Sequence, residues 1–151
     1  MTDFKAGLLF ASILIAPTPT FETAFSGTRT ATTNIAAVSS QGNGALGEIH
    51  AKISPGDGST LLNADPFIET DTQASAKTTK MIAQDFTGDK LDNKDITYSF
   101  RIDGNYVGGP SAGAAMTLAT VAAIENRSVP QGVAVTGTIR SDGSIGRVGG
   151  I

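Results

Sequence analysis

The sequence contains no cysteine and only one histidine, His50. The absence of cysteine excludes disulfides, thiol nucleophiles and cysteine-ligated metal sites. A single histidine leaves only one candidate for a histidine-based catalytic triad. Basic residues are also scarce, with 11 Lys and Arg against 14 Asp and Glu, and the net charge of −3 argues against a nucleic-acid-binding surface. Any catalysis must therefore rest mainly on hydroxyl, amine, carboxylate or backbone groups.

The sequence also lacks a hydrophobic run long enough to span a bilayer directly. Residues 6–16 form an uncharged apolar run of eleven residues that ends at Pro17, whereas a membrane-spanning helix needs roughly 20. Eleven residues is the length of a signal-peptide core. We expect residues 1–17 to be a hydrophobic leader, either a signal peptide or a membrane anchor, and the protein to be exported or membrane-anchored. A buried N-terminal helix or strand is the alternative.

The remaining length suits one folded domain with its own core, because 40% of the residues are apolar and 17% are charged. Residues 18–33, rich in Thr and containing Pro19, predict a linker. Alternating apolar residues and turn signals predict strands in the rest of the chain. We expect a hairpin of residues 34–38 and 48–54, a short strand at 60–62, a short buried strand at 132–136, a long strand at 96–102, a turn at 103–105, and a final hairpin from Ile139 to Val148.

Two segments predict helices. Residues 71–86 carry a candidate N-cap, Asp71, and end before Gly88; their expected apolar stripe is Ala74, Met81, Ile82 and Phe86. The segment from about Ser111 to Glu125 is almost wholly apolar, so it is expected to be buried on most sides. Strands and helices in this order predict an α/β (α+β) domain with a mixed sheet, hairpins and packed helices.

The segment Gly108–Gly113 contains the best candidate nucleophile, Ser111. Its small neighbours leave the hydroxyl accessible to a bulky substrate, and the start of a helix offers unpaired N–H groups that can stabilise an oxyanion. The segment matches G-x-S-x-G, but a nucleophile elbow needs a histidine downstream of the serine, and none follows Ser111. A triad with upstream His50 stays open, although the position of His50 on the polar face of an alternating strand is typical of a surface histidine.

Other motifs predict no cofactor and no metal. Residues 42–47 match G-x-G-x-x-G, but a strand follows them where a dinucleotide site needs a helix, so a hairpin turn is favoured. No Walker A motif is present, so we expect the chain to carry no ATPase activity of its own. The acidic residues between Asp85 and Asp95 miss the EF-hand spacing and predict a solvated loop.

Three ordered blocks, residues 109–113, 133–137 and 146–151, resemble the proteolytic domain of Lon proteases. They are similar in particular to the stand-alone, ATP-independent Lon-like proteases of archaea, which have an N-terminal hydrophobic leader. The resemblance implies an ATP-independent serine endopeptidase that cleaves peptide bonds with a Ser–Lys dyad. Ser111 would be the nucleophile and Thr136 would orient the lysine, while Gly109, Pro110 and Ala112 would shape the oxyanion site.

In that family the catalytic lysine follows the Gly-Gly-Ile/Leu segment by three residues, which places it three residues beyond Ile151. We therefore expect residues 34–151 to be a C-terminally truncated Lon-like domain that lacks the last helix and strand, and the 151-residue chain to be inactive. The family also implies protein or peptide substrates and a homo-oligomer. A non-catalytic Lon-like binding or assembly module is the alternative, and a secreted, β-rich structural domain is a third interpretation.

Overall fold

The computed structural model of the protein describes residues 25–38, 42–64, 68–102 and 108–149. The expected leader at 1–17 and the expected turn at 103–105 lie outside these residues. Among the helices that are described, none combines the length and the apolar character needed to cross a membrane.

A five-stranded mixed sheet forms one layer of the domain. Strands β1 (Arg29–Val38) and β2 (Gly44–Pro55) pair in antiparallel fashion, as the sequence predicts, with Thr32 opposite His50. Strand β4 (Lys94–Ile102) lies antiparallel on the other side of β2. Strands β3 (Thr60–Ala64) and β5 (Ala134–Val135) complete the edges, each parallel to its neighbour, and give the order β3-β4-β2-β1-β5. The expectation of a buried strand at 132–136 was wrong, because β5 is a two-residue edge strand and residues 132–134 are exposed.

Alternation along the strands decides which face of the sheet is covered. The inward side chains of β2 and β4 include Ile49, Ile53 and Tyr98, which are fully buried, whereas their neighbours in sequence face solvent. Strand β1 begins at Arg29, within the segment predicted as a linker, so residues 29–33 belong to the sheet. The Thr residues that suggested a linker are β-branched and therefore suit a strand.

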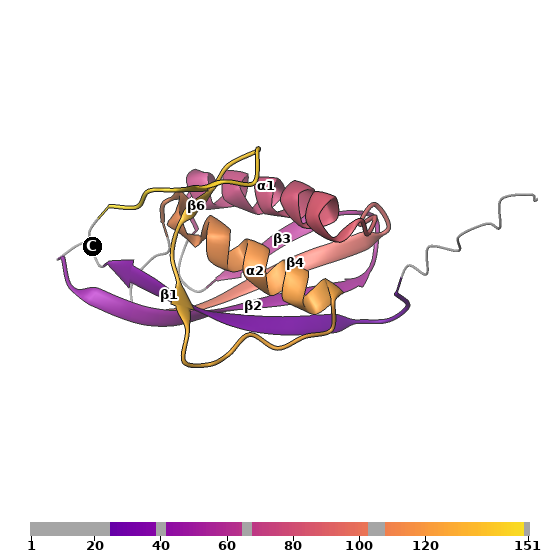
Figure 1. Ribbon diagram of the computed structural model, residues 1–151, viewed down its shortest axis with the longest axis horizontal. Coiled ribbons are helices and arrows are strands. Elements are labelled where there is room, and N and C mark those ends of the chain that lie inside the picture. Colours follow the sequence, from indigo (N-terminus) through magenta and orange to yellow (C-terminus); the bar gives the residue numbers. More distant parts are fainter. Residues whose placement is uncertain (1–24, 39–41, 65–67, 103–107, 150–151) are drawn as a thin grey trace, which may run out of the picture.

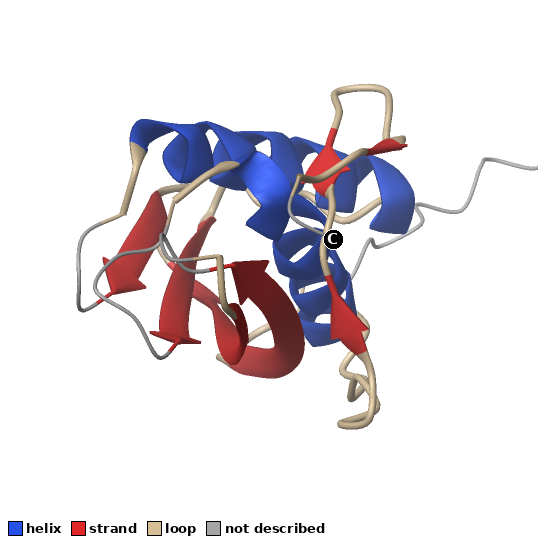
Figure 2. Ribbon diagram, turned by 90° about the vertical axis from the view of Figure 1, so that its left-hand side faces the viewer, coloured by secondary structure: helices blue, strands red, loops and turns tan. Residues whose placement is uncertain are grey.

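Two helices form the second layer and cover one face of the sheet (Figures 1 and 2). Helix α2 (Gly113–Ile124) follows a short 3₁₀ helix, η1 (Pro110–Ala112), and lies over β1 and β2. Its many alanines, among them the fully buried Ala115 and Ala119, let its backbone approach the sheet closely. Helix α1 (Thr70–Thr87) packs beside α2. The α+β prediction is confirmed.

The face that α1 buries differs from the predicted apolar stripe. Met81 and Phe86 are 42% and 71% exposed, Ala74 is exposed, and Ile82 is only half-buried. The buried residues are instead small or hydroxyl-bearing, namely Thr72, Ser75, Ala76, Thr79 and Ala83. The N-cap is Glu69 and not Asp71. The prediction was wrong because the helix packs its hydroxyl face against polar backbone, and hydrophobicity alone does not detect such a surface.

A separate two-stranded hairpin ends the described chain. Strands β6 (Thr138–Ile139) and β7 (Ile145–Gly146) pair in antiparallel fashion, which confirms the predicted final hairpin. In its turn, Asp142 accepts hydrogen bonds from the hydroxyl and the backbone N–H of Ser144. These bonds lower the pKa of Asp142, because they favour the charged carboxylate.

The beginning of the described chain is fastened to the domain by cations around one aromatic ring. The Phe25 ring lies beneath the charged groups of Arg29 and Lys94, at 4.1 and 4.7 Å from its centroid. The buried Lys94 ammonium also donates to the Phe25 carbonyl oxygen at 2.6 Å. Arg29 donates to the carbonyl of Ile124 at the end of α2, where a positive charge is favourable. These contacts fix residue 25 against both layers.

Two buried threonines in the core differ in their hydrogen bonds. The Thr120 hydroxyl lies 2.6 Å from the Tyr98 hydroxyl and donates to the Met116 carbonyl; burial raises the pKa of Tyr98. Thr33 is only 1% exposed, and its hydroxyl has no hydrogen-bond partner among the described residues. A buried polar group without a partner costs about 1–3 kcal/mol.

We therefore predict that Thr33→Val raises the free energy of unfolding by about 1 kcal/mol, because it removes the unpaired hydroxyl and keeps the shape of the side chain. Thr120→Val is the matched control and should lower the same quantity by about 1–3 kcal/mol, because it leaves the Tyr98 hydroxyl buried without this partner. Urea denaturation followed by circular dichroism measures both values. Equal destabilisation by the two variants would contradict the assignment.

Candidate active site

Ser111 lies in the segment of residues 108–113, which includes η1 and leads into α2. We call this segment the serine loop. Gly109 adopts a φ of 84°, a left-handed conformation that favours glycine. Pro110 then starts the 3₁₀ turn, where its fixed φ is favourable, and Gly113 starts α2. The sequence prediction of a serine at the mouth of a helix is confirmed, and the side chain of Ser111 is half-buried.

Helix α1 contacts the serine loop through polar groups. The hydroxyls of Thr72, Ser75 and Thr79 donate to the carbonyl oxygens of the loop at Gly109, Pro110 and Gly113, at 3.0, 3.4 and 3.3 Å respectively. The Glu69 carboxylate accepts the Gly109 N–H at 3.0 Å. Sequence reasoning missed these residues, although hydroxyls at positions 72, 75 and 79 recur at helical spacing and so share one helix face.

The segment after β5 holds the other side of the serine loop through backbone groups. The Gly137 N–H donates to the Ser111 carbonyl oxygen at 2.8 Å, and the Ala114 N–H donates to the Gly137 carbonyl oxygen at 2.9 Å. Thr136 precedes Gly137 directly and is half-buried. The structure therefore brings the 109–113 and 133–137 blocks together, as the resemblance implied, although it records no hydrogen bond from the Thr136 side chain to a described residue.

Two glycines make this close contact possible. A Cβ atom on Gly113 would lie 2.7 Å from Ile139 Cγ2 and 2.9 Å from the Ile139 backbone nitrogen. A Cβ atom on Gly137 would lie 2.6 Å from Ile145 Cγ2 and 3.2 Å from the Ala114 Cβ. Both positions are buried. The start of α2 and the β6–β7 hairpin thus meet at a distance that only glycine permits.

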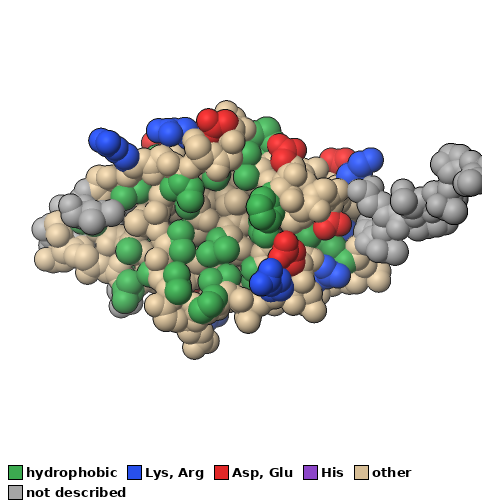
Figure 3. Space-filling view, viewed as in Figure 1, with side chains coloured by type: hydrophobic (Ala, Val, Ile, Leu, Met, Phe, Trp, Pro, Cys, Tyr) green, Lys and Arg blue, Asp and Glu red, His purple; other side chains and the backbone are tan. Residues whose placement is uncertain are grey.

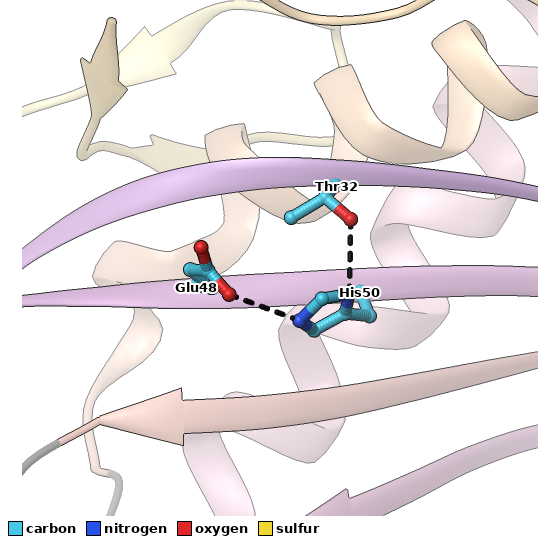
Figure 4. Close-up of polar contacts among 3 residues, drawn as sticks. All are labelled: Thr32, Glu48 and His50. Atoms are coloured by element: carbon cyan, nitrogen blue, oxygen red, sulfur yellow. Dashed lines mark hydrogen bonds and ion pairs between the residues drawn. The ribbon is translucent and has the colours of Figure 1, made fainter. Parts of the chain in front are cut away.

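His50 is not placed to act on Ser111. It lies between the buried residues Ile49 and Ala51 of β2 and so faces away from α2. Its Nδ1 atom lies 2.9 Å from the Thr32 hydroxyl, and its Nε2 atom lies 3.2 Å from the Glu48 carboxylate (Figure 4). The sheet itself separates these groups from the helix layer. The alternative of a Ser111–His50 triad is therefore wrong.

The described lysines form no hydrogen bond with the Ser111 hydroxyl, and three of them have other surroundings. Lys80 and Lys94 donate to the carbonyl oxygens of Gly58 and Phe25. Lys77 is exposed and, at five positions after Thr72, lies roughly 140° around α1 from that residue. Among the described residues, none forms a hydrogen bond with the Ser111 hydroxyl.

A groove on the uncovered face of the sheet is separate from the serine loop. It has a volume of about 870 Å³, and Glu48, Asn63, Ser99 and Arg101 are among the residues that line it. Ser111 does not line this groove.

On the face that Figure 1 turns to the viewer, charged side chains lie mainly along the upper edge and toward the right, and apolar side chains occupy much of the middle (Figure 3). Leu118 and Val133 are among the exposed apolar residues.

We predict that Gly113→Ala destabilises the protein by about 1–3 kcal/mol, because the added methyl group would overlap the Ile139 backbone. Gly132→Ala is the matched control: its Cβ would have nothing within 4 Å, so the free energy of unfolding should change little. Chemical denaturation of the two variants measures the difference. The close-contact interpretation would be overturned by equal stability of Gly113→Ala and Gly132→Ala.

Comparison with known proteins identifies the domain. Residues 30–151 match the family of the Lon protease (S16) C-terminal proteolytic domain. A search of curated proteins gave no match. The match covers well over half of the chain, includes the serine loop and the segment that holds it, and fits the mixed sheet with two helices. The chain therefore belongs to the family of Lon protease proteolytic domains.

Proposed function

We propose that this protein is an ATP-independent serine endopeptidase in which Ser111 is the nucleophile of a Ser–Lys dyad. The observation that carries the proposal is the setting of Ser111: its carbonyl is fixed by Gly137, the carbonyls on both sides of it are fixed by α1, and its hydroxyl has no partner among the described residues. A hydroxyl held on a fixed backbone and free of other bonds suits a nucleophile.

In the proposed reaction, the Ser111 Oγ attacks the carbonyl carbon of the scissile peptide bond while a base takes the hydroxyl proton. The N–H of Ser111 lies in the first turn of η1, where backbone N–H groups have no intrahelical acceptor, and it is available to the developing oxyanion. Gly109, Pro110 and Ala112 shape this part of the site. The base returns the proton to the leaving amine, and water then releases the acyl group from Ser111.

The proposed base is a neutral lysine three residues beyond Ile151, as the family resemblance implies. A lysine acts as a base when burial lowers its pKa, because an apolar surrounding disfavours the ammonium form. In this proposal the Thr136 hydroxyl orients the lysine, and the 151-residue chain is inactive without it. The position of Thr136 next to Gly137, which contacts Ser111, supports this role.

The substrates of a proteolytic domain are proteins or peptides. Independence from ATP is proposed from the resemblance to the stand-alone Lon-like proteases. We also propose, from the apolar run at residues 6–16, that the protein is exported or attached to a membrane, and, from the family, that it forms a homo-oligomer.

The first test compares the 151-residue chain with a chain extended through the codons that follow Ile151. Hydrolysis of a fluorescent casein substrate is expected only in the extended chain, and Ser111→Ala in that chain should lower kcat by at least about 10³-fold, as for other catalytic nucleophiles. His50→Gln is the matched control and should leave kcat unchanged, because His50 faces away from the site.

Hydrolysis by the 151-residue chain that Ser111→Ala abolishes would overturn the assigned base but keep the nucleophile. Hydrolysis that survives Ser111→Ala would overturn the nucleophile. A serine-directed phosphonate provides a second measurement, since it should label the extended chain at Ser111 and leave the Ser111→Ala variant unlabelled. A folded, extended chain with neither hydrolysis nor labelling would favour a non-catalytic binding or assembly module.

A further inference from the structure

We propose that Thr72, Ser75 and Thr79 of α1 are positioning residues, which set the direction of the Ser111 N–H and hydroxyl by holding the carbonyl groups of the serine loop. This inference rests on the proposed function of Ser111. It concerns residues that contact the backbone of the serine loop, and it assigns a role to the face of α1 that the hydrophobic pattern of the sequence did not indicate.

The contacts form one continuous set along one side of the helix. Thr72 and Thr79 are fully buried and Ser75 is 6% exposed. Their acceptors are the carbonyl oxygens of Gly109, Pro110 and Gly113, which lie on both sides of Ser111 in the chain. Spacings of three and four residues place the three hydroxyls on one helix face. The helix therefore holds the loop both before and after the nucleophile.

The contact made by Ser75 determines the direction of an amide. The Pro110 carbonyl and the Ser111 N–H belong to the same planar, trans peptide unit, so they point in opposite directions. Because the Ser75 hydroxyl draws the Pro110 oxygen toward α1, the Ser111 N–H points away from α1. That N–H is the proposed oxyanion donor, and such a donor is effective only when its direction is fixed before the reaction.

The Thr79 contact fixes the peptide unit that starts α2. The Gly113 carbonyl accepts the Thr79 hydroxyl at 3.3 Å, and the Ala114 N–H of the same peptide unit donates to the Gly137 carbonyl at 2.9 Å. Helix α1 therefore binds the carbonyl end of this peptide unit, and the segment after β5 binds its N–H end. The Thr117 hydroxyl also donates to the Gly113 carbonyl and lies 3.2 Å from the Thr79 hydroxyl.

Helix propensity supports a role beyond packing. Thr and Ser are weaker helix formers than Ala by up to about 0.7 kcal/mol per residue, yet they occupy much of the buried face of α1. Alanine at these positions would favour the helix and would still fill a closely packed surface. A local choice that disfavours the helix and supplies hydrogen bonds to the nucleophile's loop is typical of a functional requirement.

The test uses the extended, active chain and the variants Thr72→Val, Ser75→Ala and Thr79→Val. Each is expected to lower kcat by about 10- to 100-fold, the effect of a small misplacement of a catalytic group, with little change in KM. The rate of phosphonate labelling at Ser111 should fall by a similar factor. Thr78→Val is the matched control on the same helix, because its hydroxyl donates to the Ala74 carbonyl of α1 itself; its kcat should stay at the level of the parent chain.

Three further measurements separate positioning from stability and from the function of Ser111. Thr72→Ser and Thr79→Ser keep the hydroxyl and should restore most of the lost kcat, and thermal unfolding of every variant shows whether the fold is intact. Folded variants with the same kcat as Thr78→Val, in a chain that Ser111→Ala inactivates, would overturn this inference alone. Hydrolysis that survives Ser111→Ala would overturn the proposed function itself.

Discussion

The close contact between the start of α2 and Gly137 is the constraint on which the candidate site depends. Two backbone hydrogen bonds join the Ser111 carbonyl and the Ala114 N–H to the same residue, so the loop cannot rotate about one bond alone. The contact requires glycine at positions 113 and 137, because a side chain at either would meet Ile139 or Ile145. A glycine here costs conformational freedom, and the benefit is a serine loop packed directly against the β6–β7 hairpin.

Much of the fold follows from the sequence because one face of the sheet is buried. Strict alternation from Ile96 to Ile102 and in β2 identifies both the strands and their inward side chains, since a shift of one residue would turn every apolar side chain toward water. The segment after Ser111 predicts a buried helix because it is almost wholly apolar and would otherwise expose its side chains to water. The Asp142-Gly143 pair predicts the final hairpin turn, in which Gly143 adopts a φ of 80°.

The part of the site contributed by α1 could not be predicted in this way. Hydrophobic periodicity selected Met81 and Phe86 as inward residues, yet both are exposed. The true inward face carries hydroxyls because its partner is the backbone of the serine loop, at separations of 34 to 37 residues along the chain. A sequence pattern shows that Thr72, Ser75 and Thr79 share a face, but it does not show which carbonyl groups lie opposite them.

The hydroxyls of Thr32 and Ser111 have different surroundings, and comparing them explains why Ser111 is the better candidate nucleophile. The Thr32 hydroxyl contacts the His50 imidazole, which in turn contacts the Glu48 carboxylate, as in a catalytic triad. These residues lie within regular strands of the sheet, and not at the start of a helix, where backbone N–H groups have no intrahelical acceptor. Ser111 has a fixed backbone and an available N–H. A base is one side chain that a neighbouring segment can bring, whereas the direction of a backbone amide depends on the packing of two helices and a hairpin. The element that depends on the whole fold is present at Ser111, which makes Ser111 the better candidate nucleophile.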